Sequence, residues 1–164
     1  MAVDPRTTLQ IVKQEIADCG NDASRWGWIF SEIDEEKQLF TVRMKSPIDQ
    51  NEFIIEIKFD QYKSQPLFIE FIEPSTGNRG TLKAYPKSSG KAGGFFHNNP
   101  CICHPCSRKA YRVEERPQAP HSDWNMSGWQ QNPKVGSLTN LRAILQAIYI
   151  RISDPECYGG RMGG

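Results

Sequence analysis

The chain has 164 residues, a formal net charge of +1 and 38% hydrophobic residues, which is typical of one globular domain. A net charge this small gives no general attraction to nucleic acid or to anionic membranes, so we expect neither as a partner. No apolar run approaches the ~18 residues of a membrane-spanning helix. The opening MAVDPRTTLQ lacks the basic and then apolar layout of a secretory signal, which favours a cytoplasmic location.

The first half of the chain predicts one helix followed by four strands. Asp4 and Pro5 are typical of a helix N-cap and first helical residue, and apolar residues then recur at helical spacing to about Gly20. Short polar connections separate four strand-like stretches, at residues 26–33, 39–44, 53–59 and 67–72. Because these connections are short, the order predicts an antiparallel meander.

The second half is irregular until a final helix. Residues 74–133 show little periodicity and are rich in Gly, Pro, Ser and Asn, and a loop this long is usually functional. An amphipathic helix is predicted from Ser137 to a stop at Asp154 and Pro155, with a mobile tail over 155–164. We therefore expect a single α+β domain over residues 1–164, in which a helix packs on one face of the sheet.

The irregular segment contains the densest chemistry in the chain. Residues 97–106, HNNPCICHPC, hold three of the five cysteines and two of the three histidines. An odd number of clustered cysteines is not typical of a disulfide framework, and cytoplasmic thiols are normally reduced. A metal site, a redox site and a nucleophilic site are the chemistries that explain such a cluster, and the absence of a Cys-x-x-Cys opening a helix after a strand disfavours a thioredoxin-like redox role. The cysteines are Cys19, Cys101, Cys103, Cys106 and Cys157.

The order of these features resembles the ubiquitin-conjugating enzyme (UBC) family over residues 4–155. Tyr85-Pro86 follows the fourth strand as the family's Tyr-Pro motif does, and His97-Asn98-Asn99 is similar to its His-Pro-Asn element. Trp129, Pro133 and the helix after Leu138 look like its Trp-x-x-x-Pro region and second helix. The resemblance implies a two-layer UBC-like fold. No counterpart of the family's C-terminal helices follows Asp154.

The narrower resemblance is to the bacterial conjugating-enzyme-like proteins of CBASS anti-phage operons. It implies a thiol acyl transferase that carries the C-terminal glycine of a partner protein as a cysteine thioester. The partner would be a cGAS-like nucleotidyltransferase, and the acceptor a protein lysine. The first predicted helix carries few basic residues, Arg6 and Lys13, whereas the family commonly uses a basic face there to meet an activating enzyme.

Three cysteines compete for the nucleophile. The resemblance favours a Cys-x-Cys pair close to the Asn, so we expect Cys101 to carry the acyl group with Cys103 as its partner. In an extended segment these two residues point to the same side. Cys106 is the third candidate. His97, His104 and the basic residues after Cys106 would favour a thiolate if they converge on it.

Asn99 and Asp123 each have two interpretations. The Asn99 amide could donate to the oxyanion of the tetrahedral intermediate, as the family's Asn is thought to, or it could hold the shape of its loop. Asp123 could orient the acceptor amine, or it could cap a short turn around Asn125.

The alternative function is a non-catalytic adaptor of the same fold with a structural zinc. Cys101, Cys103, Cys106 and His104 have the donor types that zinc prefers, and His97 shares them. His121 or Cys157 could complete such a site. Most structural zinc sites, however, join two separated ligand pairs, whereas this cluster is a single stretch. The enzyme hypothesis needs no cofactor.

Overall fold

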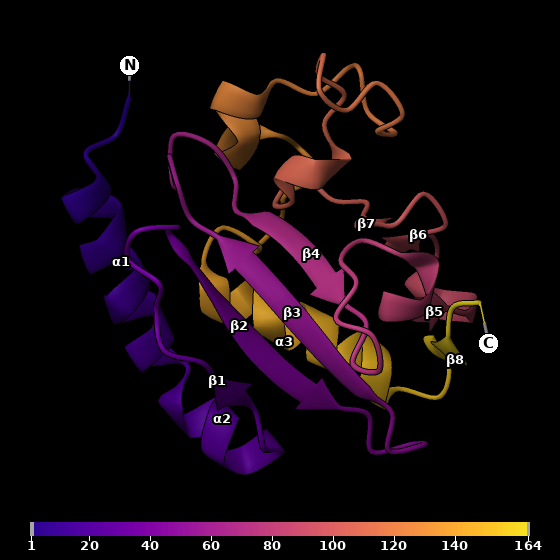
Figure 1. Cartoon of the computed structure of the whole chain (residues 1–164). Helices are drawn as coiled ribbons and strands as arrows, with labels where there is room; N and C mark the ends of the chain where they lie inside the picture. Colours follow the sequence, from indigo (N-terminus) through magenta and orange to yellow (C-terminus); the bar gives the residue numbers. More distant parts are fainter. Residues whose placement is uncertain (1, 164) are drawn as a thin grey trace.

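Four antiparallel strands in sequence order form the central sheet, as the sequence predicts (Figure 1). The structure is a computed structural model that describes residues 2–163. Short 3₁₀ turns connect several elements. In chain order the elements are α1 (Pro5–Asp18), α2 (Gly20–Trp26), β1 (Ile29–Phe30), β2 (Leu39–Lys45), β3 (Glu52–Lys58), β4 (Phe68–Ile72), η1 (Leu82–Ala84), β5 (Pro86–Ser88), η2 (Gly90–Ala92), β6 (Phe96–His97), β7 (Cys101–Ile102), η3 (Arg108–Ala110), η4 (Met126–Gln131), α3 (Leu141–Ser153) and β8 (Tyr158–Arg161).

The central strand β3 is buried on both faces. Phe53, Ile55 and Ile57 are fully buried on the face that α3 covers, and the alternating register predicted for this strand is present. On the other face Glu56 is also buried, because Arg79 folds over it and pairs with its carboxylate at 2.8 Å. A buried charge is tolerated when it is paired and hydrogen-bonded in this way.

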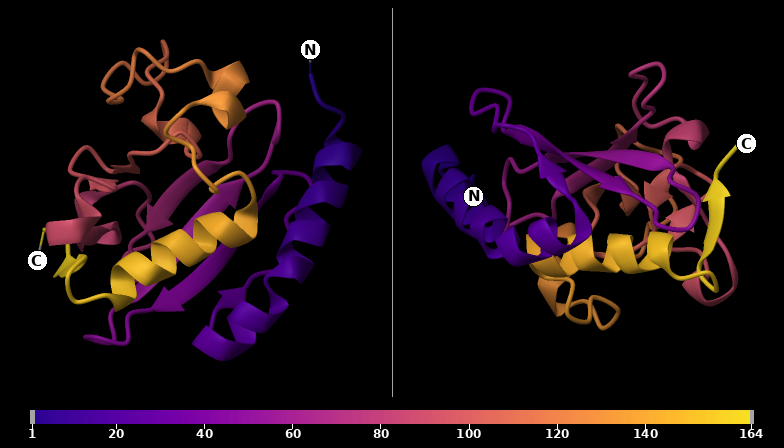
Figure 2. Two further views of the ribbon diagram at one scale, coloured as in Figure 1. Left: turned by 180° about the vertical axis from the view of Figure 1, so that it is seen from behind. Right: turned by 90° about the horizontal axis from the view of Figure 1, so that it is seen from below.

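Helix α3 lies across the back of the sheet, and the core fills the space between them (Figure 2). Its apolar face is the one predicted from the sequence, and all of it is buried: Leu141, Ile144, Leu145, Ile148 and Ile152. The helix begins at Leu141 rather than at Ser137. Asn140 is the N-cap, and its side chain accepts a hydrogen bond from the Ala143 N–H at 2.9 Å, which satisfies one of the free donors of the first turn.

The predicted strand over residues 26–33 is mostly wrong. Trp26 ends α2, Gly27 closes that helix in the left-handed conformation with φ 73°, and only β1 is extended. The alternation of Trp26 and Trp28 reflects helix packing instead, because the Trp26 ring stacks on Tyr149 of α3 at 4.9 Å. Tertiary contacts have overridden the local pattern.

The tail predicted to be mobile at residues 155–164 contains a strand. β8 pairs antiparallel with β5, and the Tyr158 hydroxyl donates to the Asp49 carboxylate at 2.9 Å. Cys157 and Met162, on either side of the strand, are buried. The sequence ECYGGRMGG looks too polar and glycine-rich for a strand, and it is ordered because β5 offers a free edge. Within residues 2–163, no helix combines the length and apolarity needed to cross a membrane.

Glu15 on α1 connects three parts of the fold. Its carboxylate accepts hydrogen bonds from the Tyr62 hydroxyl at 2.8 Å and from the Leu141 N–H at 2.6 Å, and it pairs with Lys63 at 3.1 Å. Glu15 is only 9% exposed, so these partners replace the water it has lost. The helix α1 is thereby joined to the loop after β3 and to the first turn of α3.

We predict that Glu15→Ala lowers the free energy of unfolding by about 3 kcal/mol, because it leaves three buried or partly buried groups without their acceptor. Urea denaturation with circular dichroism measures this. The matched control is Glu35→Ala, whose partner Lys13 and own side chain are mostly exposed, and which should change stability by no more than about 0.5 kcal/mol. Equal effects of the two substitutions would contradict the role assigned to Glu15.

Candidate active site

The cysteine segment begins with a small hairpin. β6 and β7 pair antiparallel, with His97 opposite Cys101, and the chain turns at residues 98–100. The Asn99 N–H donates to His97 Nδ1 at 3.0 Å, which closes this turn. Phe96 and Ile102 anchor the hairpin in the core, because both side chains are buried.

Arg108 fixes the next part of the segment to the sheet. Its Nε donates to the Pro66 carbonyl at 3.0 Å, and its guanidinium pairs with the Asp60 carboxylate at 3.1 Å. The Arg108 N–H also donates to the Leu67 carbonyl at 2.9 Å, just before β4. Arg108 is only 9% exposed, so the planar guanidinium is held by partners in fixed directions.

Backbone hydrogen bonds to and beside the anchored turn η3 place His121 next to the cysteine segment. The His121 N–H donates to the Ala110 carbonyl at 3.1 Å, and the His121 carbonyl accepts from the Arg112 N–H at 2.8 Å. These bonds close a loop over residues 112–120 and hold the His121 backbone in place. As a result His121, which is 18 residues after Cys103 in the sequence, lies next to it.

Cys103, His121 and Asp123 form a continuous chain of polar contacts. The Cys103 sulfur is 3.1 Å from His121 Nε2, and His121 Nδ1 is 3.4 Å from an Asp123 carboxylate oxygen. The Trp124 ring is parallel to the imidazole within 5°, with the ring centres 3.4 Å apart. The imidazole therefore has a contact at each nitrogen and an aromatic wall against one face.

This geometry is that of a nucleophile, a base and a group that orients the base. Burial raises the pKa of the Cys103 thiol, and the nearby Lys134 opposes that rise only partly. The thiol is therefore protonated near neutral pH, and its sulfur needs a base to remove the proton during attack. His121 Nε2 is within reach of that proton, and Asp123 can stabilise the imidazolium that results.

Cys101, the predicted nucleophile, lies in a different environment. It is 2% exposed, and burial together with the charge of Cys103 raises the pKa of its thiol to about 12. Its side chain forms part of the wall of a pocket of about 250 Å³. Of the predicted pair, it is Cys103 and not Cys101 that contacts a base.

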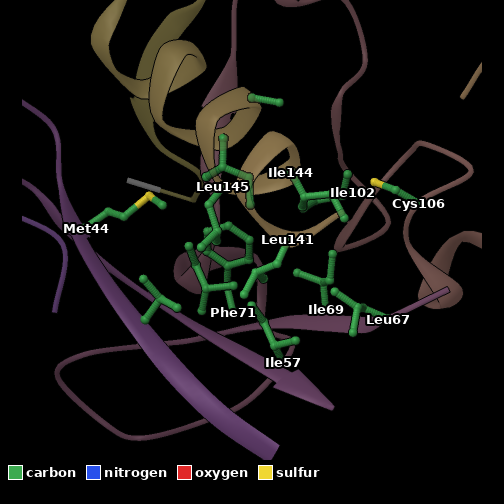
Figure 3. Close-up of a cluster of buried hydrophobic side chains, with 14 of the residues drawn as sticks. Met44, Ile57, Leu67, Ile69, Phe71, Ile102, Cys106, Leu141, Ile144 and Leu145 are labelled. Atoms are coloured by element: carbon green, nitrogen blue, oxygen red, sulfur yellow. The ribbon is translucent and has the colours of Figure 1, made fainter. Parts of the chain in front are cut away.

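Cys106 and His104 have structural roles: Cys106 packs in the core, and His104 accepts a backbone hydrogen bond. Cys106 is fully buried beside Leu67, Ile69 and Ile102, where Figure 3 shows it in the hydrophobic core, and burial raises its pKa to about 12. The ring of His104 accepts the Cys106 N–H at 3.1 Å through Nδ1. Burial and the nearby Arg151 lower the pKa of His104 to about 4, so its imidazole is neutral at pH 7.

Asn99 occupies the second of its two predicted roles. Its side-chain amide donates to the Gln118 carbonyl, so it ties the hairpin to the loop over residues 112–120. The amide NH₂ has a second N–H, which this bond leaves free to donate. The capping role expected of Asp123 is wrong, because Asn125 itself caps η4 through its own side chain, and Asp123 contacts His121 instead.

The residues predicted as zinc ligands do not gather. Within residues 2–163, no three His, Cys, Asp or Glu side chains are placed so that they could hold a metal ion. Cys106 is in the core, the His104 Nδ1 is occupied by a backbone N–H, and Cys157 lies beside Asp154 at 3.7 Å. This chain's donor set therefore does not fit the structural zinc of the adaptor hypothesis.

The role of His121 differs from the one expected from the sequence. The sequence offers it only as a possible zinc ligand, whereas the structure places it against Cys103. The available signal was His121-Ser122-Asp123, a histidine with an acid two residues away in the same irregular segment as the cysteines. Only the backbone bonds to Ala110 and Arg112 bring that signal to the thiol.

Comparisons with known proteins do not identify the chain. No protein-family model matches it, and neither a curated protein nor a solved structure is found to be similar. The description of the site therefore depends on its geometry.

We predict that iodoacetamide modifies Cys103 before any other cysteine of the native protein, because the other four thiols are buried. Since the pKa of Cys103 is raised above 9.0, the rate of modification should still increase as the pH passes 9. Peptide mapping by mass spectrometry over a pH series measures both. Faster modification of Cys101, or a rate independent of pH from about 6 upward, as a stable thiolate–imidazolium pair would give, would contradict the neutral-thiol description.

Proposed function

We propose that the chain is a thiol acyl transferase of the ubiquitin-conjugating type, with Cys103 as its nucleophile. The observation that carries the proposal is the contact between the Cys103 sulfur and His121 Nε2 at 3.1 Å, backed by Asp123. A thiol paired with a base of this kind is one arrangement that activates a thiol for acyl transfer. The proposal keeps the acyl chemistry expected from the sequence and moves it from Cys101 to the neighbouring Cys103.

The arrangement of elements supports the UBC-like interpretation. The helices α1 and α2 precede an antiparallel meander, the cysteine segment follows β4, and α3 packs behind the sheet. Tyr85 of the Tyr-Pro motif is fully buried and packs on Phe71 at 4.7 Å, and Trp129 is buried with its indole N–H donating to the Lys63 carbonyl. Both motif residues are thus part of the packed interior, which supports the proposal.

In the first step the Cys103 sulfur attacks the activated carbonyl carbon of a C-terminal glycine. His121 Nε2 takes the thiol proton, and the tetrahedral intermediate expels the leaving group of the donor, which takes up that proton. In the second step an amine attacks the thioester, an amide forms, and the Cys103 sulfur leaves and regains a proton through His121. A general base of this kind contributes about 10²–10⁴ in rate.

The partners of this reaction follow from the CBASS resemblance. The acyl donor would be the C-terminal glycine of a cGAS-like nucleotidyltransferase, the acceptor a protein lysine, and the location the cytoplasm, as part of anti-phage defence. Five free cysteines fit a reducing compartment. The alternative expected from the sequence, an adaptor with a structural zinc, is not favoured by the positions of its expected ligands; it predicts one bound zinc per chain, which metal analysis of the purified protein would detect.

We predict that a model peptide ending in Gly-Gly and supplied as an alkyl thioester transfers its acyl group to Cys103. Intact-mass spectrometry should show one adduct that free thiol removes. Cys103→Ala should abolish it, and His121→Gln should slow its formation about 100-fold, because the general base is lost. Cys101→Ala is the matched control, since it removes a neighbouring thiol and leaves the base in place.

Persistence of the adduct in Cys103→Ala, or its loss in Cys101→Ala with Cys103 intact, would contradict the assignment. Hydrolysis of the adduct without transfer to added free lysine would identify the chain as a thiol hydrolase and overturn the transferase proposal.

A further inference from the structure

The pocket beside Cys101 contains a positive charge without a negative partner. Its walls include Asn99, Cys101, Lys109, Glu115 and Arg116, and its volume is about 250 Å³. Lys109 is paired with Glu70 at 3.4 Å. The ion pairs formed by the described residues do not include Arg116.

Arg116 is held in place by contacts that do not neutralise it. One of its terminal nitrogens donates to the Arg108 carbonyl at 3.1 Å, and the guanidinium lies over the Phe68 ring at 5.4 Å. Its Nε is buried and has no hydrogen-bond partner. An arginine remains charged in proteins, so this wall offers a fixed cation. The anions that pair best with a guanidinium are a carboxylate and a phosphate.

The pocket and the reactive contact lie side by side along two segments. Cys101 and Ala119 line the pocket, whereas Cys103 and His121, each two residues further on, form the contact between thiol and base. Two residues of extended chain span about 7 Å. The part of the wall at Cys101 and Ala119 therefore adjoins the thiol and the base, so a peptide whose carbonyl reacts at Cys103 can place a neighbouring side chain in the pocket.

We propose that this pocket is a subsite for the acyl donor, and that Arg116 binds an acidic side chain one or two residues before the reacting glycine. The inference rests on the proposed function, because it is the acyl chemistry at Cys103 that makes the pocket a donor subsite. The exposed Glu115 on the same wall disfavours an anion and limits the affinity, and because Lys109 is paired with Glu70, the attraction for an anion comes from Arg116.

The test measures peptide binding by the full-length Cys103→Ala protein, so that no acyl chemistry contributes. Two short peptide amides are compared by NMR titration, one ending in Glu-Gly-amide and one in Gln-Gly-amide. The Glu peptide should bind about tenfold more tightly or better, because its carboxylate makes a charge-assisted pair with Arg116. Introducing Arg116→Gln into the Cys103→Ala protein should remove the preference for the Glu peptide. The control substitution Arg6→Gln, at an exposed arginine on α1, should leave the preference unchanged.

A third peptide, ending in Gln-Gly with a free terminal carboxylate, separates the two sources of the anion. If it binds through Arg116 more tightly than the Glu peptide amide does, the pocket holds a chain end, and the side-chain proposal is overturned. Arg116→Gln could weaken binding by loosening its loop, so a second variant is needed. Glu115→Gln removes the negative charge beside Arg116, and it should tighten binding of the Glu peptide about twofold or more. Equal affinity of the Glu and Gln peptide amides, or no effect of either substitution, overturns the proposal.

Failure of the proposed function would look different. If no thioester forms on Cys103 while the Glu peptide still binds through Arg116, the pocket is an anion site and only the acyl chemistry is wrong. If the thioester forms at equal rates from Glu-Gly and Gln-Gly donors, the transferase proposal stands and the specificity assigned to Arg116 is wrong.

Discussion

The site depends on the anchoring of Arg108 against the loop between β3 and β4. That guanidinium is bonded to the Pro66 carbonyl and to both the carboxylate and the carbonyl of Asp60, and the residue is almost completely buried. The turn η3 is thereby fixed to the sheet, and the bonds from Ala110 and Arg112 fix His121 to that turn. The distance between thiol and base is set by the sheet, although both residues lie in irregular segments. A reactive site on loops needs such a rigid support.

Burial divides the three clustered cysteines into three environments. Cys106 lies in the core beside Ile102 and packs as a small apolar side chain. Cys101 lines a pocket, and burial raises its pKa too far for it to ionise near pH 7. Cys103 is partly exposed and is the cysteine with a histidine nitrogen within hydrogen-bond distance. Because burial also raises the pKa of Cys103, a base is needed during attack, and His121 can provide it.

Sequence periodicity predicted those parts of the fold that rest on regular burial. Apolar residues alternate along residues 53–59, as in a strand, and they recur at helical spacing along α3. Where irregular contacts decide, prediction was less accurate. Trp26 belongs to a helix because it stacks on Tyr149, and residues 158–161 form a strand because β5 has an edge to pair with. No local pattern encodes either partner.

In the candidate site, too, local sequence features are predictable, whereas long-range contacts are not. The segment and its cysteines were identified from composition, and the alternative role of Asn99 as a tie within the loop was foreseen. The pairing of Cys103 with His121 was not, because 18 residues separate them and the loop that joins them has no periodicity. Backbone hydrogen bonds from His121 to Ala110 and Arg112 bring the two residues together. Residue spacing in the sequence does not predict long-range contacts of this kind.

The central claim is that Cys103 is the residue that receives the acyl group. A peptide ending in Gly-Gly and a thiol-reactive propargyl amide in place of its carboxylate would trap the nucleophile irreversibly in the native protein. Digestion and mass spectrometry then identify the modified residue. The account predicts one adduct, on Cys103, and a much slower reaction in His121→Gln. Modification of Cys101 or Cys106 instead, with Cys103 unmodified, would contradict it.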